Sequence, residues 1–272
     1  TNALPLMTEL QALRERYRSD KAALLADLPT ALAASRAIHE HLRKLSALTD
    51  ALLCDLGRRA GLPDNLALVA VGGFGRSQLF PYSDVDVLLL VPGVVATENA
   101  PTLCEKVEVF IQHCWDVGLE IGSSVRTISE CLDESRRDVT VQTSLLEARW
   151  VCGNAALFSD FQQQFRAQLD VQAFRVAKTL EMQQRHHKYE DTPYALEPNC
   201  KESPGGLRDL QIILWMTHAA GLGSTWQELA ANGLVTPFEM RQIERNHAML
   251  CLIRARLHLL AGRREDRLVF DL

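Results

Sequence analysis

Two aspartates one residue apart, Asp84 and Asp86, stand at the head of the apolar run DVDVLLL. In a β-strand, residues i and i+2 project to the same face, so the two carboxylates would lie side by side while Val85 and Val87 point into a core. Adjacent like charges repel each other, and a cation between them relieves the repulsion. Hard carboxylate oxygens suit Mg²⁺. The pair therefore predicts a magnesium site at the head of a strand.

A glycine turn precedes these aspartates. Residues 66–71 (LALVAV) read as a short strand, which the glycines of 72–75 (GGFG) break. Glycine lacks a Cβ, so backbone N–H groups can approach a phosphate closely, and Arg76 adds a fork of donors for phosphate oxygens. The turn is neither a Walker P-loop, because no Lys-Ser or Lys-Thr follows, nor a dinucleotide fingerprint, because Gln78 occupies the third glycine position.

The order of these features resembles the DNA polymerase β-type nucleotidyltransferase superfamily: a strand, a Gly-Gly turn, a short helix with Arg, a connector and a Ser-Asp-x-Asp strand. The resemblance implies a third carboxylate on a neighbouring strand, with Glu120 and Glu147 as candidates. We favour Glu147, because Glu147-Ala148-Arg149 resembles the acidic-x-Arg pattern of the superfamily and Gly153 would close that strand. Its role stays open between a metal ligand, a general base and a partner for Arg149 on a solvent-facing strand.

The surrounding pattern predicts an α+β protein. Amphipathic helices are expected over 5–27 and up to about residue 59, the latter packed on the sheet that carries the aspartates. Further elements are expected as helices at 101–117, 210–216, 225–231 and 237–260, a short helix or loop at 131–138, helical segments from 156, and strands at 119–127 and within 140–152. We predict N-terminal helices over 1–62, a catalytic core over 63–155 with a small mixed sheet, and an all-helical domain over 156–272.

A second motif lies in the helical part, where residues 194–210 read YALEPNCKESPGGLRDL. Charges and turn residues are dense here. One interpretation is a helix N-terminus with solvated charges. We prefer a loop that closes over a nucleotide, with contacts from Asn199, Lys201, Gly205, Gly206 and Arg208.

The two motifs together resemble the amino-terminal half of the family of bifunctional uridylyltransferase/uridylyl-removing enzymes, which modify the signalling protein PII. The resemblance implies transfer of UMP from UTP to a tyrosine hydroxyl of PII, with release of pyrophosphate. Two Mg²⁺ ions, or Mn²⁺ in their place, would be held by Asp84, Asp86 and Glu147. The β- and γ-phosphates would be held by Gly72, Gly73, Arg76 and Ser83.

Two alternatives differ from this function. One is nucleotidyl transfer to another acceptor, such as adenylyl transfer to glutamine synthetase or a small molecule. The other is a catalytically silent nucleotide-binding regulatory module. The chain begins with Thr and ends without a closing feature, so we expect a piece of a longer protein, with the family's HD and ACT domains outside the sequence given.

Composition limits the partners. With 34 acidic and 29 basic residues the net charge is −5, so nothing points to a nucleic acid or an anionic membrane. No apolar stretch approaches the roughly 20 residues of a membrane span. Seven scattered cysteines without a C-x-x-C pair favour reduced thiols, packed as small apolar residues in a cytoplasmic protein. The adjacent His186 and His187 diverge by about 100° on a helix, so we expect surface residues, not a shared metal site.

Overall fold

The computed structural model describes residues 3–26, 28, 34–93 and 100–272. These residues form two compact units, each assembled from separate segments. The first combines Thr1–Ala26, His41–Leu79 and Ser83–Gln168, and the second combines Asp27–Glu40, Phe80–Tyr82 and Leu169–Leu272. The sequence-based division at 62/63 and 155/156 used continuous ranges instead.

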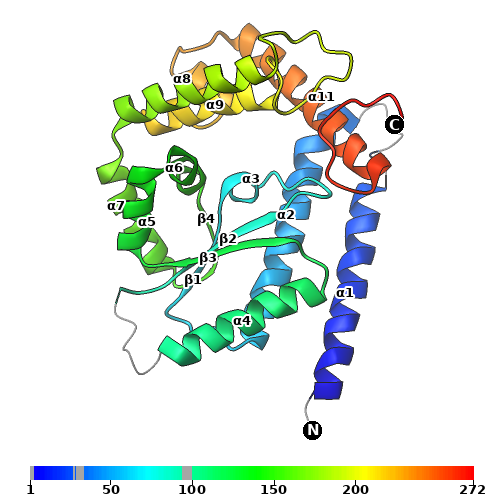
Figure 1. Ribbon diagram of the computed structural model, residues 1–272, viewed down its shortest axis with the longest axis vertical. Helices are drawn as coiled ribbons and strands as arrows, with labels where there is room; N and C mark the ends of the chain where they lie inside the picture. Colours follow the sequence, from blue (N-terminus) through cyan, green and yellow to red (C-terminus); the bar gives the residue numbers. More distant parts are fainter. Residues whose placement is uncertain (1–2, 27, 29–33, 94–99) are drawn as a thin grey trace. The chain divides into compact units, whose positions relative to one another are not determined.

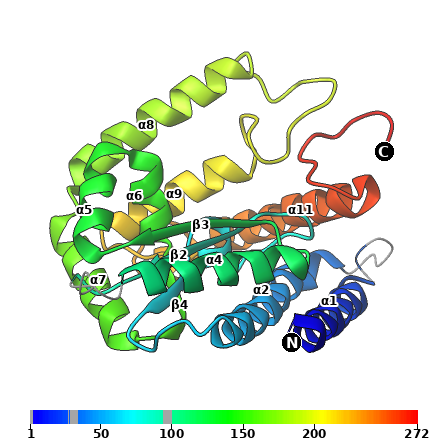
Figure 2. The same cartoon turned by 60° about the horizontal axis from the view of Figure 1, so that its bottom comes forward.

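The first unit is built on a four-stranded mixed sheet, which confirms the α+β class. Its strands are β1 (Ala67–Ala70), β2 (Val85–Leu90), β3 (Ile121–Arg126) and β4 (Arg149–Gly153), in the order β3-β2-β1-β4. Strand β1 is antiparallel to β2 and β4, whereas β2 and β3 are parallel. Parallel neighbours need a crossover, and α4 (Ala100–Asp116) supplies it, running alongside the sheet in both views (Figures 1 and 2).

The other helices follow the predicted order except for α6, which was not expected. In the first unit they are α1 (Ala3–Leu25), most of α2 (Ala34–Arg59), α3 (Gly72–Gly75), α5 (Ile128–Arg137), α6 (Val139–Leu146) and α7 (Ala155–Gln168). In the second they are α8 (Val171–Lys188), α9 (Leu207–Ala219), α10 (Trp226–Ala231) and α11 (Pro237–Ala261). Among the described residues, no helix is both long and apolar enough to cross a membrane.

Helix α2 packs its apolar stripe as predicted. Its leucines at 42, 45, 52, 53 and 56 are all buried. The buried hydroxyls of Tyr17 on α1 and Thr49 on α2 lie 2.9 Å apart and join the two helices. Thr127, Thr225 and Thr236 begin α5, α10 and α11 with capping boxes, in which threonine and the glutamate three residues later satisfy each other's backbone N–H groups.

The strand predicted within residues 140–152 is confirmed by β4. It covers the last part of this range and ends at Gly153, but 139–146 form helix α6. Asp138 caps this helix by accepting a hydrogen bond from the Thr140 backbone N–H at 2.6 Å. The stretch TVQTSLL is rich in β-branched residues, which favour strands, so the cap and not the propensity decides the local structure. Glu147 therefore lies in a turn between α6 and β4.

A buried polar cluster stabilises the second unit. The Arg254 guanidinium donates to Asp266 at 2.6 Å and lies over the Phe80 ring, with 4.1 Å to the ring centroid. His258 accepts from the Tyr82 backbone N–H at 3.2 Å through Nδ1, and its Nε2 is 3.3 Å from Asp266. Burial alone would raise the pKa of Asp266, but His258 and Arg254 together hold it well below its usual value.

Asp266→Asn should lower the free energy of unfolding by about 3 kcal/mol at neutral pH, because it leaves Arg254 buried without its charged partner. A depressed carboxyl pKa contributes stability above the unfolded value of about 3.9, and that contribution is lost as the pH falls further. Urea unfolding at neutral and acidic pH measures the difference, which should shrink in acid. An exposed carboxylate of the same segment provides the control, Asp271→Asn. A loss that is independent of pH would contradict the assignment.

Candidate active site

The two aspartates lie where the alternation placed them. Asp86 is exposed on β2 between the buried Val85 and Val87, and Asp84, also exposed, directly precedes the strand. Strand β2 is otherwise fully buried. A rigid, buried strand thus presents two carboxylates to solvent at its beginning.

Two glycines border the Asp86 carboxylate, and one of them, Gly122, makes room for it. Gly122 of β3 is its register partner, and a Cβ added to Gly122 would lie only 2.5 Å from Oδ1 of Asp86. Gly72, which has φ of +57°, begins the glycine turn that follows β1. A Cβ added to Gly72 would lie 3.7 Å from Oδ2 of Asp86 and 3.7 Å from Oγ of Ser144. The predicted site did not include Gly122 or Ser144, because the parallel pairing of β2 with β3 cannot be read from local sequence.

The glycine turn is a single helical turn, α3, wound directly after β1. Backbone N–H groups of Gly75 and Arg76 donate to the carbonyls of Val71 and Gly72 at 3.0 and 3.1 Å. Gly75 packs so closely that a Cβ there would lie 2.2 Å from the Glu147 carbonyl oxygen. The third glycine of the motif therefore serves close backbone packing, a role that the sequence prediction missed.

Arg149 fixes this turn from β4. Its guanidinium donates to both carboxylate oxygens of Asp50 on α2, at 2.7 and 3.1 Å. It also donates to the carbonyls of Phe74 and Gly75 at 3.2 and 3.3 Å, and lies 5.4 Å from the centroid of the Phe74 ring. Planar, multidentate contacts of this kind are specific to arginine. One side chain thus joins α2, β4 and the glycine turn.

Arg76 and Glu147 form an ion pair beside the turn, and the side chains are 21% and 5% exposed. The Arg76 Nε also donates to Gln78 at 3.3 Å. Because Glu147 pairs with Arg76 and Arg149 pairs with Asp50, the interpretation of Glu147 as a mere partner for Arg149 on a solvent-facing strand is wrong.

The other candidate carboxylate, Glu120, lies directly before β3 and is exposed. Its backbone carbonyl accepts from the Val85 N–H at 2.8 Å. Burial lowers the pKa of Lys21 on α1, and the nearby charge of Glu120 opposes this shift. Glu120 thus has a cationic neighbour on α1, whereas Glu147 contacts the glycine turn itself.

The second motif lies in the second unit, in the loop before α9. The Asn199 side-chain oxygen accepts from the backbone N–H groups of Lys201 and Glu202 at 3.0 and 2.8 Å. Gly205 has φ of +79°, and a Cβ on Gly206 would lie 2.8 Å from the Ser203 carbonyl oxygen. The conformation of the loop backbone therefore explains why an amide side chain stands at Asn199 and why glycine stands at 205 and 206.

The charges of this loop are paired within the second unit. Arg208 donates to Glu202 at 3.0 Å and lies 5.2 Å from the Trp215 ring centroid. Lys201 lies 3.5 Å from Glu202, and burial, together with nearby arginines, lowers the pKa of Lys201. These pairs hold two cations at the beginning of α9, where they remain candidates for contacts with an anion.

His186 is not the surface residue expected from sequence. Its Nε2 lies 2.9 Å from Asp209 of α9, which also pairs with Arg185 and accepts from the Gly205 backbone N–H at 2.7 Å. Only His187 is exposed, with Asp191 at 3.6 Å. His186 therefore helps to fix the loop before α9, whereas His187 faces solvent.

Comparison with known proteins finds two family models, which match different parts of the chain. Residues 53–146 match a family model described as a nucleotidyltransferase domain, and residues 173–272 match one described as GlnD PII-uridylyltransferase. The first match contains β1, the glycine turn and both aspartates. The second contains the loop from Asn199 to Asp209.

Curated relatives match nearly the whole chain, and each is named a bifunctional uridylyltransferase/uridylyl-removing enzyme. Those of Cupriavidus pinatubonensis and Cupriavidus metallidurans are 54% and 53% identical over 99% and 98% of the chain. That of Burkholderia thailandensis is 55% identical over 95% of it. The chain spans 31%, 30% and 29% of the length of these three relatives. With its carboxylate pair and glycine turn, the chain belongs to the family of bifunctional uridylyltransferase/uridylyl-removing enzymes and contains a nucleotidyltransferase domain.

Proposed function

We propose that the chain transfers UMP from UTP to a tyrosine hydroxyl of a PII signalling protein and releases pyrophosphate. The observation that carries this proposal is the exposed pair Asp84 and Asp86 at the head of a buried strand, within the matched nucleotidyltransferase domain. The PII-uridylyltransferase match over 173–272 supports the choice of acceptor. The net charge of −5 disfavours a nucleic-acid acceptor.

The residues at the aspartate pair fit divalent magnesium. Both carboxylates are exposed, and the absence of a Cβ at Gly122 leaves space at Oδ1 of Asp86. Asp84 and Asp86 would hold two Mg²⁺ ions, or Mn²⁺, through hard oxygen ligands, and Glu147, whose carboxylate pairs with Arg76 in this structure, would complete the set. When bound, these ions would neutralise charge on the triphosphate and lower the pKa of the incoming hydroxyl, which is about 10 in free tyrosine.

The chain's own residues would position the triphosphate. Backbone N–H groups of Gly72 and Gly73, with Arg76 and Ser83, would hold the β- and γ-phosphates. The Arg76 guanidinium donates to Glu147 and Gln78, so it is already oriented beside the turn. Nucleotidyl transfer depends mainly on such positioning and on charge neutralisation.

Glu147 would act as the third carboxylate from the turn before β4. Its carbonyl oxygen contacts Gly75 and its carboxylate pairs with Arg76, so the same short segment sets both the turn and the acidic group. An aspartate there would be one methylene shorter.

The second unit would supply the nucleotide-closing loop. Lys201 and Arg208 would offer cations, and Gly205 and Gly206 would offer backbone N–H groups. The Asn199 side-chain oxygen is occupied by two backbone N–H groups, so this residue would contact the nucleotide through its amide nitrogen.

Incubation with PII, Mg²⁺ and labelled UTP or ATP tests the reaction. We expect label on PII from UTP, and Asp86→Asn should reduce the rate by at least about 100-fold, because charge stabilisation of this kind is typically worth that much. Asp160→Asn, a change to an exposed carboxylate on α7, serves as the matched control. Near-normal transfer by Asp86→Asn would exclude the assigned site, and transfer from ATP alone would favour the adenylyl alternative. UTP binding without turnover, in this chain and in the full-length protein, would favour a silent module.

Gly122→Ala tests whether the Asp86 carboxylate needs the space that Gly122 leaves beside it. The new Cβ would lie 2.5 Å from Oδ1 of Asp86, so the carboxylate must rotate or move. We expect UMP transfer to fall by about 10-fold to 100-fold, since misplacement of about 1 Å can cost that much, with an unchanged circular dichroism spectrum. Gly93→Ala is the matched control because no atom lies within 4 Å of its added Cβ. Equal activity of the two variants would mean that Asp86 needs no such space.

A further inference from the structure

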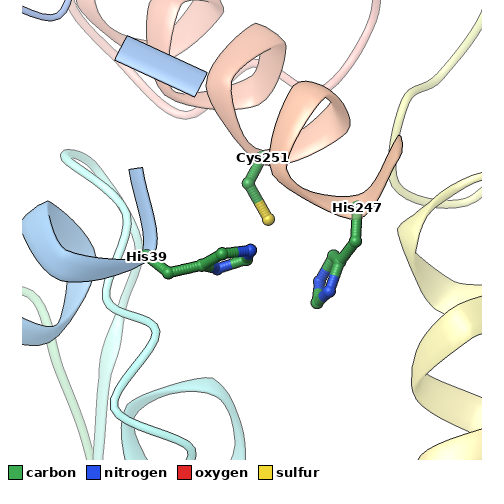
Figure 3. A group of neighbouring side chains, drawn as sticks. All are labelled: His39, His247 and Cys251. Atoms are coloured by element: carbon green, nitrogen blue, oxygen red, sulfur yellow. The ribbon is translucent and has the colours of Figure 1, made fainter. Parts of the chain in front are cut away.

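Three side chains with metal-binding atoms come together in the second unit, outside the aspartate site. His39 reaches from α2 toward Cys251 and His247, which both come from α11 (Figure 3). One ligand atom from each residue lies within 4.8 Å of those of the other two. The predicted site residues include none of the three.

Helix geometry arranges two of these ligands. His247 and Cys251 are four residues apart on α11, and residues at this spacing lie on the same face of a helix. Cys251 is 1% exposed and His247 is 6% exposed, so both point into the unit. The His39 and His247 rings have centroids 4.8 Å apart, with the planes tilted by 60°. The rings therefore meet at an angle and are not stacked face to face.

The donor set defines the class of metal. Two imidazoles and a thiolate are ligands of Zn²⁺ and related transition metals, whereas Mg²⁺ requires oxygen. With Zn–N of about 2.0 Å and Zn–S of about 2.3 Å, tetrahedral ligand atoms lie roughly 3.3 to 3.6 Å apart. Changes of side-chain rotamer that move the ligand atoms by about 1 Å would bring all three within bonding distance of one ion.

We propose that His39, His247 and Cys251 form a transition-metal site that binds Zn²⁺ with a fourth position for water. On binding, the Cys251 thiol releases its proton to solvent, and the thiolate sulfur and two imidazole nitrogens each donate an electron pair to the ion. The ion would join the beginning of α2 to α11 within the second unit. This site is separate in residues and in ligand chemistry from the carboxylates of Asp84 and Asp86.

Cobalt substitution tests the site. The chain is freed of metal with a chelator and titrated with Co²⁺, whose thiolate charge-transfer absorption reports a cysteine ligand. We expect one thiolate-bound Co²⁺ per chain, displacement of this ion by Zn²⁺, and loss of the charge-transfer absorption in Cys251→Ser. His39→Gln should weaken binding by at least about tenfold, because one of three protein ligands is lost. It leaves the buried Cys251 intact, so the test remains decisive if Cys251→Ser does not fold.

Matched controls separate this site from other groups. Cys104→Ser alters an exposed thiol on α4, and Asp86→Asn alters the proposed magnesium site, so both should keep the absorption and the affinity. Zn²⁺ should also raise the melting temperature of the unaltered chain by more than that of His39→Gln. Absence of the charge-transfer absorption in the unaltered chain, its persistence in a folded Cys251→Ser variant, or equal Co²⁺ affinity of His39→Gln would overturn the proposal.

Discussion

The contacts of Arg149 are the constraint on which the proposed active site depends. The side chain binds Asp50 of α2 with two hydrogen bonds and the carbonyls of Phe74 and Gly75 with two more. Positions far apart in the sequence are thereby held around one guanidinium. Because Gly72 of the same turn borders Asp86 and Arg76 pairs with Glu147, the orientation of the turn sets the surroundings of both acidic groups.

Much of this arrangement could be predicted because it is local. The exposure of Asp84 and Asp86 follows from the two-residue period of a strand, and the order of strand, turn and strand follows from the apolar runs. The contacts of Gly122 and Arg149 could not be predicted from the sequence. Each of these residues contacts a distant part of the chain that strand pairing or helix packing brings near. Glu147 contacts the glycine turn, and its role as the third carboxylate stays a prediction; its expected placement in a strand was wrong because Asp138 caps a helix that ends just before it.

The loop from Asn199 to Asp209 shows the limit of compositional arguments. Dense charge next to glycines was interpreted as a ligand-binding loop, and that role remains a proposal. The structure gives these charges partners of their own: Glu202 for Arg208, and Arg185 with His186 for Asp209. A loop fixed by its own ion pairs is preorganised, and preorganisation reduces the entropy lost when a ligand binds. The pairing is therefore compatible with either role.

The central claim is that Asp84 and Asp86 make UTP binding depend on magnesium. Calorimetric titration of UTP with and without Mg²⁺, in the unaltered chain and in the double variant Asp84→Asn/Asp86→Asn, tests this claim without requiring an acceptor or turnover. The account predicts that Mg²⁺ tightens UTP binding by at least about tenfold, or 1.4 kcal/mol, in the unaltered chain and not in the variant. The same magnesium dependence in both proteins would contradict it.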